Sequence, residues 1–212
     1  MAFISTIPVD DATGEVRAAY ERSQARFGYV PNHAKVFSHR PQVLAAWEGL
    51  LKSVRGNLDP RRYELISVAA ARALRSSYCA LAHGVILRDR FYSAPRLTAI
   101  IDDAAAELSP ADAAIVAFAE KVARDATTTT ETDVRALREH GLSDAEIFDV
   151  AAAAAVRSFF SKLLDALGVA PDSQYGEVED ELRRRLTVGR PIDTLAAARL
   201  PTTETPDARG HR

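Results

Sequence analysis

The sequence predicts an all-α fold, and three observations support this prediction. Apolar residues recur at spacings of three and four along most of the chain, as on one face of a helix. Capping residues followed directly by proline, a common helix start, occur at Asp59-Pro60 and Ser109-Pro110. The strict alternation that is typical of strands hardly occurs. We therefore expect one domain of about eight helices.

The first four expected helices are bounded by caps and breaks. Gly28 interrupts the first pattern, and Pro41 suits the first turn of the second helix. Asp59 caps the third helix, and either Ser76 or Ser77 caps the fourth. These helices cover about residues 10–26, 41–51, 60–75 and 78–90.

The remaining four helices are signalled in the same way. A short helix follows Ser93, and Ser109 caps the next one. Gly141 stops the seventh helix, while Ser143 and Glu146 form a capping box for the eighth. These helices cover about residues 97–101, 110–122, 131–140 and 145–167.

The eighth helix has no continuous polar face between Val150 and Leu164. Such a helix is usually surrounded by other helices or by a partner subunit. We therefore expect Phe159 and Phe160 to pack in the core and the protein to form a homo-oligomer.

The character of the chain changes after Pro171. Residues 177–185 are highly charged, and the last stretch of roughly 20 residues is polar, with two prolines. Such a stretch cannot bury enough apolar surface to offset the entropy lost on ordering. We expect a single domain over residues 1–170 and, over residues 171–212, a charged extension with a disordered tail.

Composition excludes several classes of function. The formal net charge of -2 and the pI near 6.2 leave no basic stripe for nucleic acid. No basic start with an apolar run and no membrane-length apolar segment is present in the sequence, so we expect no membrane association. A chain with one cysteine forms no internal disulfide, which favours a cytoplasmic location.

Cys79 and His83 are the first candidate site residues. Their spacing of four places them on one face of a helix, and Cys79 falls in the first turn, where the helix dipole favours a thiolate. Arg72 and Arg75 are the cations nearest in sequence. The pair is equally compatible with an inert, buried cysteine, because cysteine is among the most buried residue types.

The other histidines give no metal site. His33 and His39 fall near a turn and a helix end, and no further His, Cys or Asp completes a ligand set. His140 precedes Gly141 at a helix end, which suits a structural role. With no glycine-rich phosphate loop either, we expect neither a metal nor a cofactor.

Five residues, Glu64, Ser76, Tyr78, Cys79 and His83, form the pattern E-x11-S-x-Y-C-x3-H. This pattern resembles the alkylhydroperoxidase D-like and carboxymuconolactone decarboxylase family, whose peroxidase members carry E-x11-C-x-x-C-x3-H. The resemblance extends over about residues 10–170, including the stretches GYVPN, SHRP and LREHGLSDAEIFD. It implies an AhpD-like helical domain of about eight helices and the oligomers common in that family.

The resemblance also implies a role for each motif residue. Cys79 matches the cysteine that attacks the hydroperoxide, and His83 matches the histidine that helps to deprotonate this cysteine. Glu64 matches the carboxylate that orients this histidine or relays its proton. Ser76 replaces the cysteine that closes a disulfide with the attacking thiol, and Tyr78 occupies a position that is often histidine. Resolution within the chain is therefore not expected, and an external thiol reductant would be needed.

Three functions follow from the residues and the resemblance. The first is a single-cysteine peroxidase that reduces hydroperoxides, an antioxidant oxidoreductase. The second is acid–base chemistry of the lactone decarboxylase type, in which His83 and Glu64 move protons on a small lactone acid and Cys79 only lines the pocket. The third is an inactive oligomeric member of the family. Spacing alone leaves all three open.

Overall fold

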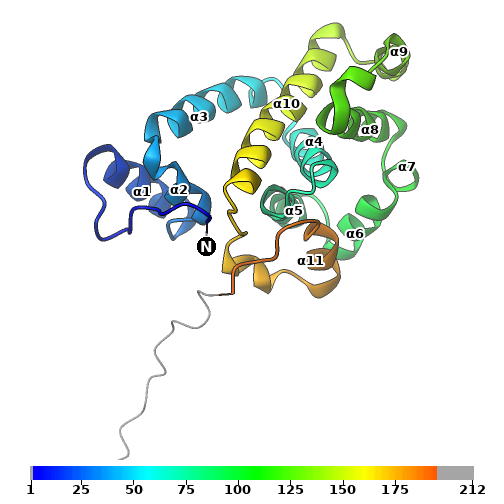
Figure 1. The fold of residues 1–212 in the computed structure, drawn as a ribbon. Helices are drawn as coiled ribbons and strands as arrows, with labels where there is room; N and C mark the ends of the chain where they lie inside the picture. Colours follow the sequence, from blue (N-terminus) through cyan, green and yellow to red (C-terminus); the bar gives the residue numbers. More distant parts are fainter. Residues whose placement is uncertain (1, 195–212) are drawn as a thin grey trace, which may run out of the picture.

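The computed structural model describes residues 2–194, and this part of the chain is all-helical, as predicted (Figure 1). No strand occurs within the described residues. The helices are α1 (Gly14–Phe27), α2 (Asn32–Val36), α3 (Pro41–Arg55), α4 (Pro60–Ala73), α5 (Ser77–Arg90), α6 (Ala94–Asp102), α7 (Ala104–Glu107), α8 (Pro110–Asp125), α9 (Glu131–Glu139), α10 (Asp144–Ala166) and α11 (Asp180–Leu186). Short 3₁₀ turns cover Phe37–His39, Ala126–Thr128 and Ser173–Glu177.

The described residues contain eleven α-helices instead of about eight. The eight long helices were all predicted, and the three additional ones are α2, α7 and α11. These have 5, 4 and 7 residues, so none exceeds two turns. A helix of this length has too few apolar positions to show a period of 3.6.

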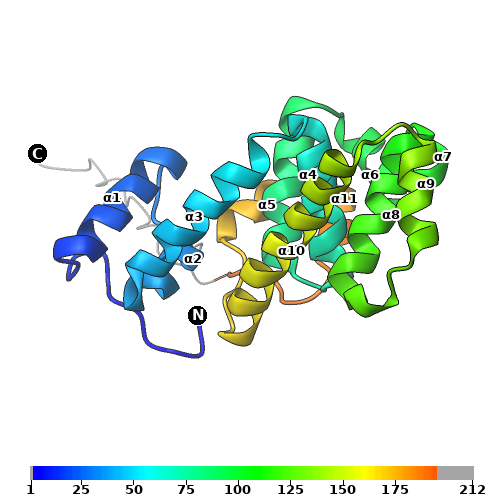
Figure 2. The same ribbon diagram turned by 90° about the horizontal axis from the view of Figure 1, so that it is seen from above.

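Helix α4 lies at the centre of the larger part of the molecule. It packs against α5, α8 and α10 (Figures 1 and 2), and every residue from Tyr63 to Ala71 is buried. The sequence of this stretch, YELISVAAA, is small or apolar except for Glu64 and Ser67. A charged residue in such a helix needs a partner from a neighbouring element, which is the first structural sign of a site at Glu64.

Helices α1, α2 and α3 form a smaller group at one side of this body (Figure 2). A small cluster of buried residues, separate from the main core, joins α1 and α2 around Tyr20, whose hydroxyl donates to the carbonyl of Ile7. Helix α3 packs against α10, which joins the two groups.

Helix α10 confirms the predicted capping box, since Ser143 and Glu146 bond each other's backbone. Phe160 is buried as expected, but Phe159 is 46% exposed, so its placement in the core was wrong. Adjacent residues point about 100° apart around a helix, so one can face the core while the other faces solvent.

The segment after residue 170 continues as a 3₁₀ turn and α11. Leu182 and Leu186 are fully buried, and α11 packs against α5 and α6. Arg185 forms an ion pair with Asp102 at the surface of this contact. The expected disordered tail lies at 195–212, outside the described residues.

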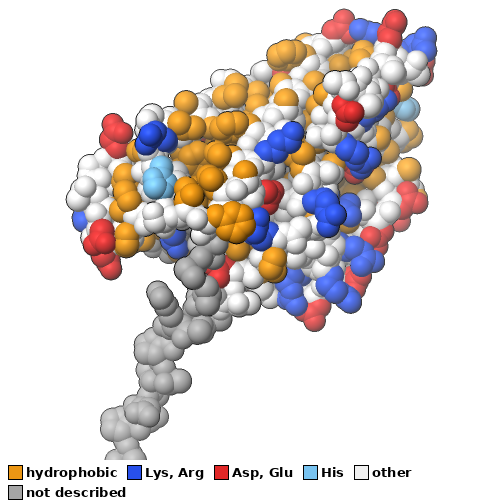
Figure 3. Space-filling view, viewed as in Figure 1, with side chains coloured by type: hydrophobic (Ala, Val, Ile, Leu, Met, Phe, Trp, Pro, Cys, Tyr) orange, Lys and Arg blue, Asp and Glu red, His pale blue; other side chains and the backbone are white. Residues whose placement is uncertain are grey.

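Apolar side chains remain exposed over α3 and α10 (Figure 3). The largest are Leu50, Phe148 and Phe159, which are 53%, 70% and 46% exposed. Among helices within residues 2–194, none has the length and apolar character needed to cross a lipid bilayer.

Candidate active site

Four of the five predicted site residues line one cavity. This cavity has a volume of about 850 Å³ and lies between the group α1–α3 and the helices α4, α5 and α10. Glu64 reaches it from α4, whereas Tyr78, Cys79 and His83 reach it from α5. Ser76 is fully buried but is not part of the cavity wall.

The turn between α4 and α5 places the cysteine. Arg75 adopts a left-handed backbone conformation, with φ of 58°, between the two helices. Ser76, one of the two serines predicted as the cap, is the N-cap residue of α5, although its side chain makes no capping bond. Cys79 therefore lies in the first turn of α5, and its thiol is 1% exposed.

Glu64 and His83 are a closely paired dyad. The Nδ1 atom of His83 lies 2.5 Å from one carboxylate oxygen of Glu64, which is 1% exposed. Arg55 lies 3.6 Å from the other oxygen. A carboxylate accepts hydrogen bonds, so Nδ1 carries the proton and Nε2 of His83 keeps its lone pair.

The electrostatics of the dyad favour a neutral histidine. Burial and the nearby Arg157 cation lower the pKa of His83, and the attraction of Glu64 only partly offsets them. Burial alone would raise the pKa of Glu64, but His83, Arg55 and Arg157 outweigh it, so this pKa is lowered. At neutral pH the dyad is an ionised carboxylate that holds a neutral imidazole able to accept a proton.

Arg157 is a residue of the candidate site that the sequence analysis missed. It comes from α10, is 3% exposed, and donates from one nitrogen to the sulfur of Cys79 at 3.9 Å and from another to the Tyr63 hydroxyl at 3.0 Å. Burial would lower the pKa of Arg157, but its partners Cys79 and Tyr63 outweigh this and raise it. A guanidinium in this position suits a negative charge on the sulfur.

Arg72 and Arg75, the cations nearest to Cys79 in sequence, do not line the cavity that contains the thiol. Arg75 is exposed, and Arg72 lines a different cavity. The only sequence signal for Arg157 is its isolation within AAAAAVRSFF, where it is the one charged residue of an otherwise small or apolar stretch. A buried cation in such a stretch requires polar partners, but the sequence does not indicate which ones.

Tyr78 belongs to a second polar cluster in the same cavity. Its hydroxyl donates to Asp172 at 2.5 Å, and its oxygen lies 2.9 Å from Nδ1 of His33. The backbone N–H of Asn32 donates to the other oxygen of Asp172 at 2.7 Å. The sequence placed His33 near a turn, and its ring is hydrogen-bonded to Tyr78 within this cluster.

Burial shifts the pKa values of this cluster. Burial, with a smaller effect of Arg26, lowers the pKa of His33 to about 4, so this ring is neutral at neutral pH. Burial raises the pKa of Asp172, although Tyr78 and Asn32 partly oppose this. Burial and the neighbouring Asp172 also raise the pKa of Tyr78 well above its usual value. Asp172 and Tyr78 thus hold their protons more firmly than the same groups do in water, whereas His33 holds its proton less firmly.

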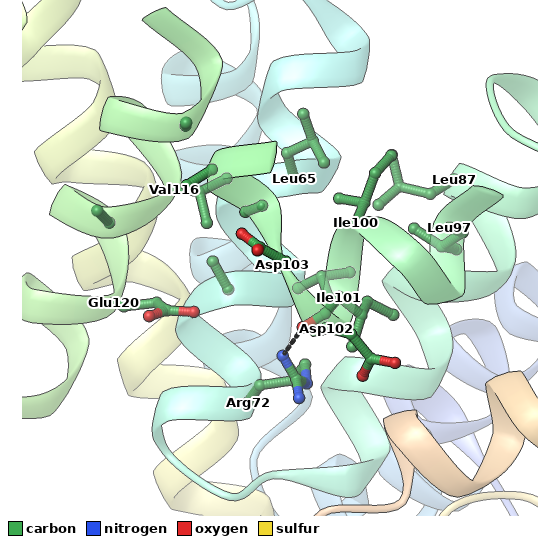
Figure 4. A pocket seen from close by; sticks show the side chains of 16 residues that line it. Leu65, Arg72, Leu87, Leu97, Ile100, Ile101, Asp102, Asp103, Val116 and Glu120 are labelled. Atoms are coloured by element: carbon green, nitrogen blue, oxygen red, sulfur yellow. Dashed lines mark hydrogen bonds between the residues drawn. The ribbon is translucent and has the colours of Figure 1, made fainter. Parts of the chain in front are cut away.

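A second cavity, of about 330 Å³, is lined by residues of α4, α5, α6, α7 and α8 (Figure 4). It is lined mainly by apolar residues such as Leu65 and Val116, and Arg72 there donates to the carbonyl of Ile101 at 3.2 Å. None of the predicted site residues reaches it. Within residues 2–194 no three His, Cys, Asp or Glu side chains group as metal ligands.

Solved structures are similar to this one over most of their length. An AhpD-core, peroxidase-related protein from Ralstonia eutropha JMP134 is 26% identical, with a TM-score of 0.71, over 89% of this chain and 98% of that one. A peroxidase-related protein from Silicibacter sp. TM1040 is 24% identical, with a TM-score of 0.68, over 82% of this chain and 91% of that one.

The debrominase Bmp8, solved in complex with 2,3,4-tribromopyrrole, shares the fold at 17% identity and a TM-score of 0.67, over 86% of this chain and 95% of that one. No curated protein matches the chain. The model of the carboxymuconolactone decarboxylase family matches residues 41–121, which include Glu64, Cys79 and His83. Residues 41–121 therefore resemble the carboxymuconolactone decarboxylase family, and the fold is that of the AhpD-like, peroxidase-related proteins.

Proposed function

We propose that this protein is a thiol peroxidase that reduces hydroperoxides through Cys79. The observation that supports this most strongly is the donation from Arg157 to the Cys79 sulfur, inside a cavity that also contains the paired His83 and Glu64. A thiol near a cation and a neutral imidazole is in the kind of environment that activates cysteine nucleophiles.

The proposed reaction has two half-steps. The thiolate of Cys79 attacks the distal oxygen of the hydroperoxide, so an S–O bond forms, the O–O bond breaks and the alkoxide leaves with a proton. In the second half-step two external thiols reduce the sulfenic acid to the thiol, giving a disulfide and water. Neutral His83 would take the thiol proton and return it to the leaving alkoxide.

The replacement of the resolving cysteine by Ser76 explains why an external thiol is required. Ser76 is the N-cap of α5 and Cys79 lies one turn further along, so Ser76→Cys would put a second thiol close to the first. We expect this variant to form an intramolecular disulfide after one equivalent of peroxide, which dithiothreitol then reduces.

The proposal is tested by treating the protein with cumene hydroperoxide and trapping the product with dimedone. We expect a sulfenic acid adduct at Cys79 by mass spectrometry, formed at least tenfold more slowly in His83→Ala and in Glu64→Gln. A coupled assay with an external dithiol measures turnover. If Cys79 gives no adduct and the Ser76→Cys variant forms no disulfide, the peroxidase assignment is wrong.

One observation favours a second candidate function. His83 is neutral and bonded to an ionised Glu64, whereas within the described residues no hydrogen bond joins His83 to the sulfur of Cys79. This arrangement also suits proton transfer on a small lactone acid, without a thiol. Lactone acid turnover that survives Cys79→Ala but is lost in His83→Ala would identify this second function.

A further inference from the structure

We infer that the cavity takes an aromatic hydroperoxide that carries an anionic group at the end opposite to the peroxide. This inference rests on the proposed function for the reacting group and names the substrate class. Size, wall chemistry and charge each support a part of it.

The size of the cavity argues against hydrogen peroxide as the main substrate. About 850 Å³ falls within the range of pockets that hold drug-sized organic ligands. One water occupies roughly 30 Å³, so a peroxide molecule alone would leave the cavity largely filled with solvent. An organic body is needed to exclude that solvent from the thiol.

Aromatic side chains form the inner wall. Trp47 and Phe160 are stacked, with ring centroids 4.2 Å apart, and both line the cavity together with Tyr63 and Tyr175. Flat rings are favoured beside such walls, because offset and edge contacts between aromatic groups add to apolar burial. The body of the substrate should therefore be an aromatic ring.

The charged residues are distributed unevenly between the outer and inner ends of the cavity. Its exposed lining residues include the cations Arg22, Arg26 and Lys52, against one exposed carboxylate, Glu48. Cys79, in contrast, is 1% exposed at the inner end. A substrate with its peroxide at the thiol would therefore place an anionic group among the outer cations.

Two buried donors suit the oxygens of the reacting end, one on the arginine that contacts the thiol and one on a tryptophan beside that arginine. Nε of Arg157 and Nε1 of Trp47 are buried without a hydrogen-bond partner among the described residues, and both side chains line the cavity. The guanidinium lies 5.9 Å from the Trp47 ring. Buried donors of this kind are normally paired, and peroxide oxygens are acceptors.

The test measures binding without chemistry, in full-length Cys79→Ala protein. Trp47 is the only tryptophan of the chain and lines the cavity, so its fluorescence reports occupancy without a label. The probes are 4-phenylbutanoate, its neutral analogue 4-phenylbutan-1-ol and its non-aromatic analogue 4-cyclohexylbutanoate. We expect the first to bind about tenfold more tightly than the alcohol and about threefold more tightly than the cyclohexyl acid.

The outer cations are tested with a matched pair of double variants. Arg26→Gln with Lys52→Gln should weaken 4-phenylbutanoate binding by about tenfold and leave the alcohol unchanged. Arg124→Gln with Lys162→Gln removes the same charge from exposed positions outside both cavities and should change neither. Equal affinity for acid and alcohol, or equal effects of the two double variants, would overturn the inference.

The outcome is independent of the peroxidase test. If the affinity ratios hold but Cys79 does not react with hydroperoxides, the ligand class survives and the thiol chemistry is rejected. If Cys79 reacts but the ratios fail, the reaction stands and the substrate class is wrong.

Discussion

Arg157 is buried beside a thiol and not beside a carboxylate. Among the described residues its polar contacts are the Tyr63 hydroxyl and the Cys79 sulfur, and no carboxylate lies within ion-pair distance. Burying an unpaired cation costs several kcal/mol, so Arg157 needs polar partners, and the fold supplies the Cys79 sulfur and the Tyr63 hydroxyl. We expect this contact to make Cys79 a more reactive nucleophile.

Replacement of Arg157 should slow the reaction of Cys79 more than it disturbs the fold. We expect Arg157→Met to reduce the rate of alkylation by iodoacetamide at pH 7 by about tenfold or more, as a loss of roughly 1.4 kcal/mol corresponds to tenfold. Arg157→Lys keeps the charge and should recover part of the rate. Tyr63→Phe is the control, because it removes the other partner of Arg157 and leaves the cation near the thiol. Equal rates in all four proteins would contradict this role.

His33 should make the protein less stable in acid. The pKa of His33 is about 4 in the folded protein and about 6.5 in the unfolded chain. Between pH 4 and pH 6.5 the unfolded chain therefore binds more protons than the folded one. The contribution of neutral His33 to the free energy of unfolding is therefore fully present above pH 6.5. It is lost as the pH drops from 6.5 to about 4, by about 3 kcal/mol at most. Urea unfolding at pH 7, 5.5 and 4.5 measures this loss.

The His33→Gln variant isolates this effect from other titrating groups. Asp172, whose pKa is raised by burial, acts in the opposite sense, since its contribution is lost as the pH rises. Asp172 is present in both proteins, so the difference between their pH profiles reports mainly on residue 33. If the free energy of unfolding changes with pH equally in the unmodified protein and in His33→Gln, the lowered pKa of His33 is wrong.

At the level of elements, α11 is held against α5 by a close approach at Gly84. A Cβ atom at Gly84 would lie 2.5 Å from Cδ1 of Leu186, which is fully buried. Glycine at this position in α5 therefore allows the C-terminal helix to pack directly on the element that carries Cys79 and His83.

Gly84→Ala should displace α11 and destabilise the protein by about 1–3 kcal/mol, the usual cost of overpacking a core. Gly49→Ala is the matched control, because nothing lies within 4 Å of its added Cβ and alanine favours a helix interior over glycine by about 0.5–1 kcal/mol. Opposite shifts in the urea midpoint are expected. A neutral Gly84→Ala variant would mean that Leu186 moves aside without cost.

The long helices were predictable because caps and apolar periodicity are local properties. The cap-plus-proline starts at Asp59 and Ser109 and the capping box at Ser143 all have the predicted structure, with each side chain accepting from a backbone N–H. The short α2, α7 and α11 were missed because they depend on packing against distant elements. Phe159 was misplaced because periodicity fixes which residues share a face but not which face is covered.

The site was predictable only where its residues are close in sequence or follow the family spacing. Glu64, Tyr78, Cys79 and His83 line one cavity, and three of them match the motif. Arg157 and Asp172 reach the same cavity from α10 and from the segment after it, about 80 to 90 residues further on. No local pattern relates such residues, because the tertiary fold alone brings them together.

For the whole molecule, the exposed apolar surface over α3 and α10 is the feature that most needs a partner (Figure 3). Phe148 and Phe159 are 70% and 46% exposed, and their spacing of eleven residues puts them on one face of α10. Leu50 on α3 is 53% exposed. Contiguous exposed apolar patches on soluble proteins usually mark contact sites with other proteins.

We expect a second copy of the chain to cover this surface, as predicted from the lack of a polar face on α10. Light scattering coupled to size exclusion should give a mass of at least twice the 23.0 kDa of one chain at micromolar concentration. Leu50→Glu with Phe159→Glu should shift the protein toward the monomer while circular dichroism stays unchanged, because both side chains lie outside the core. Val9→Glu, at an equally exposed apolar residue in the N-terminal segment, should leave the mass unchanged. A mass of one chain for the unmodified protein would contradict the prediction, and a double variant that keeps the oligomer would place the contact on another face.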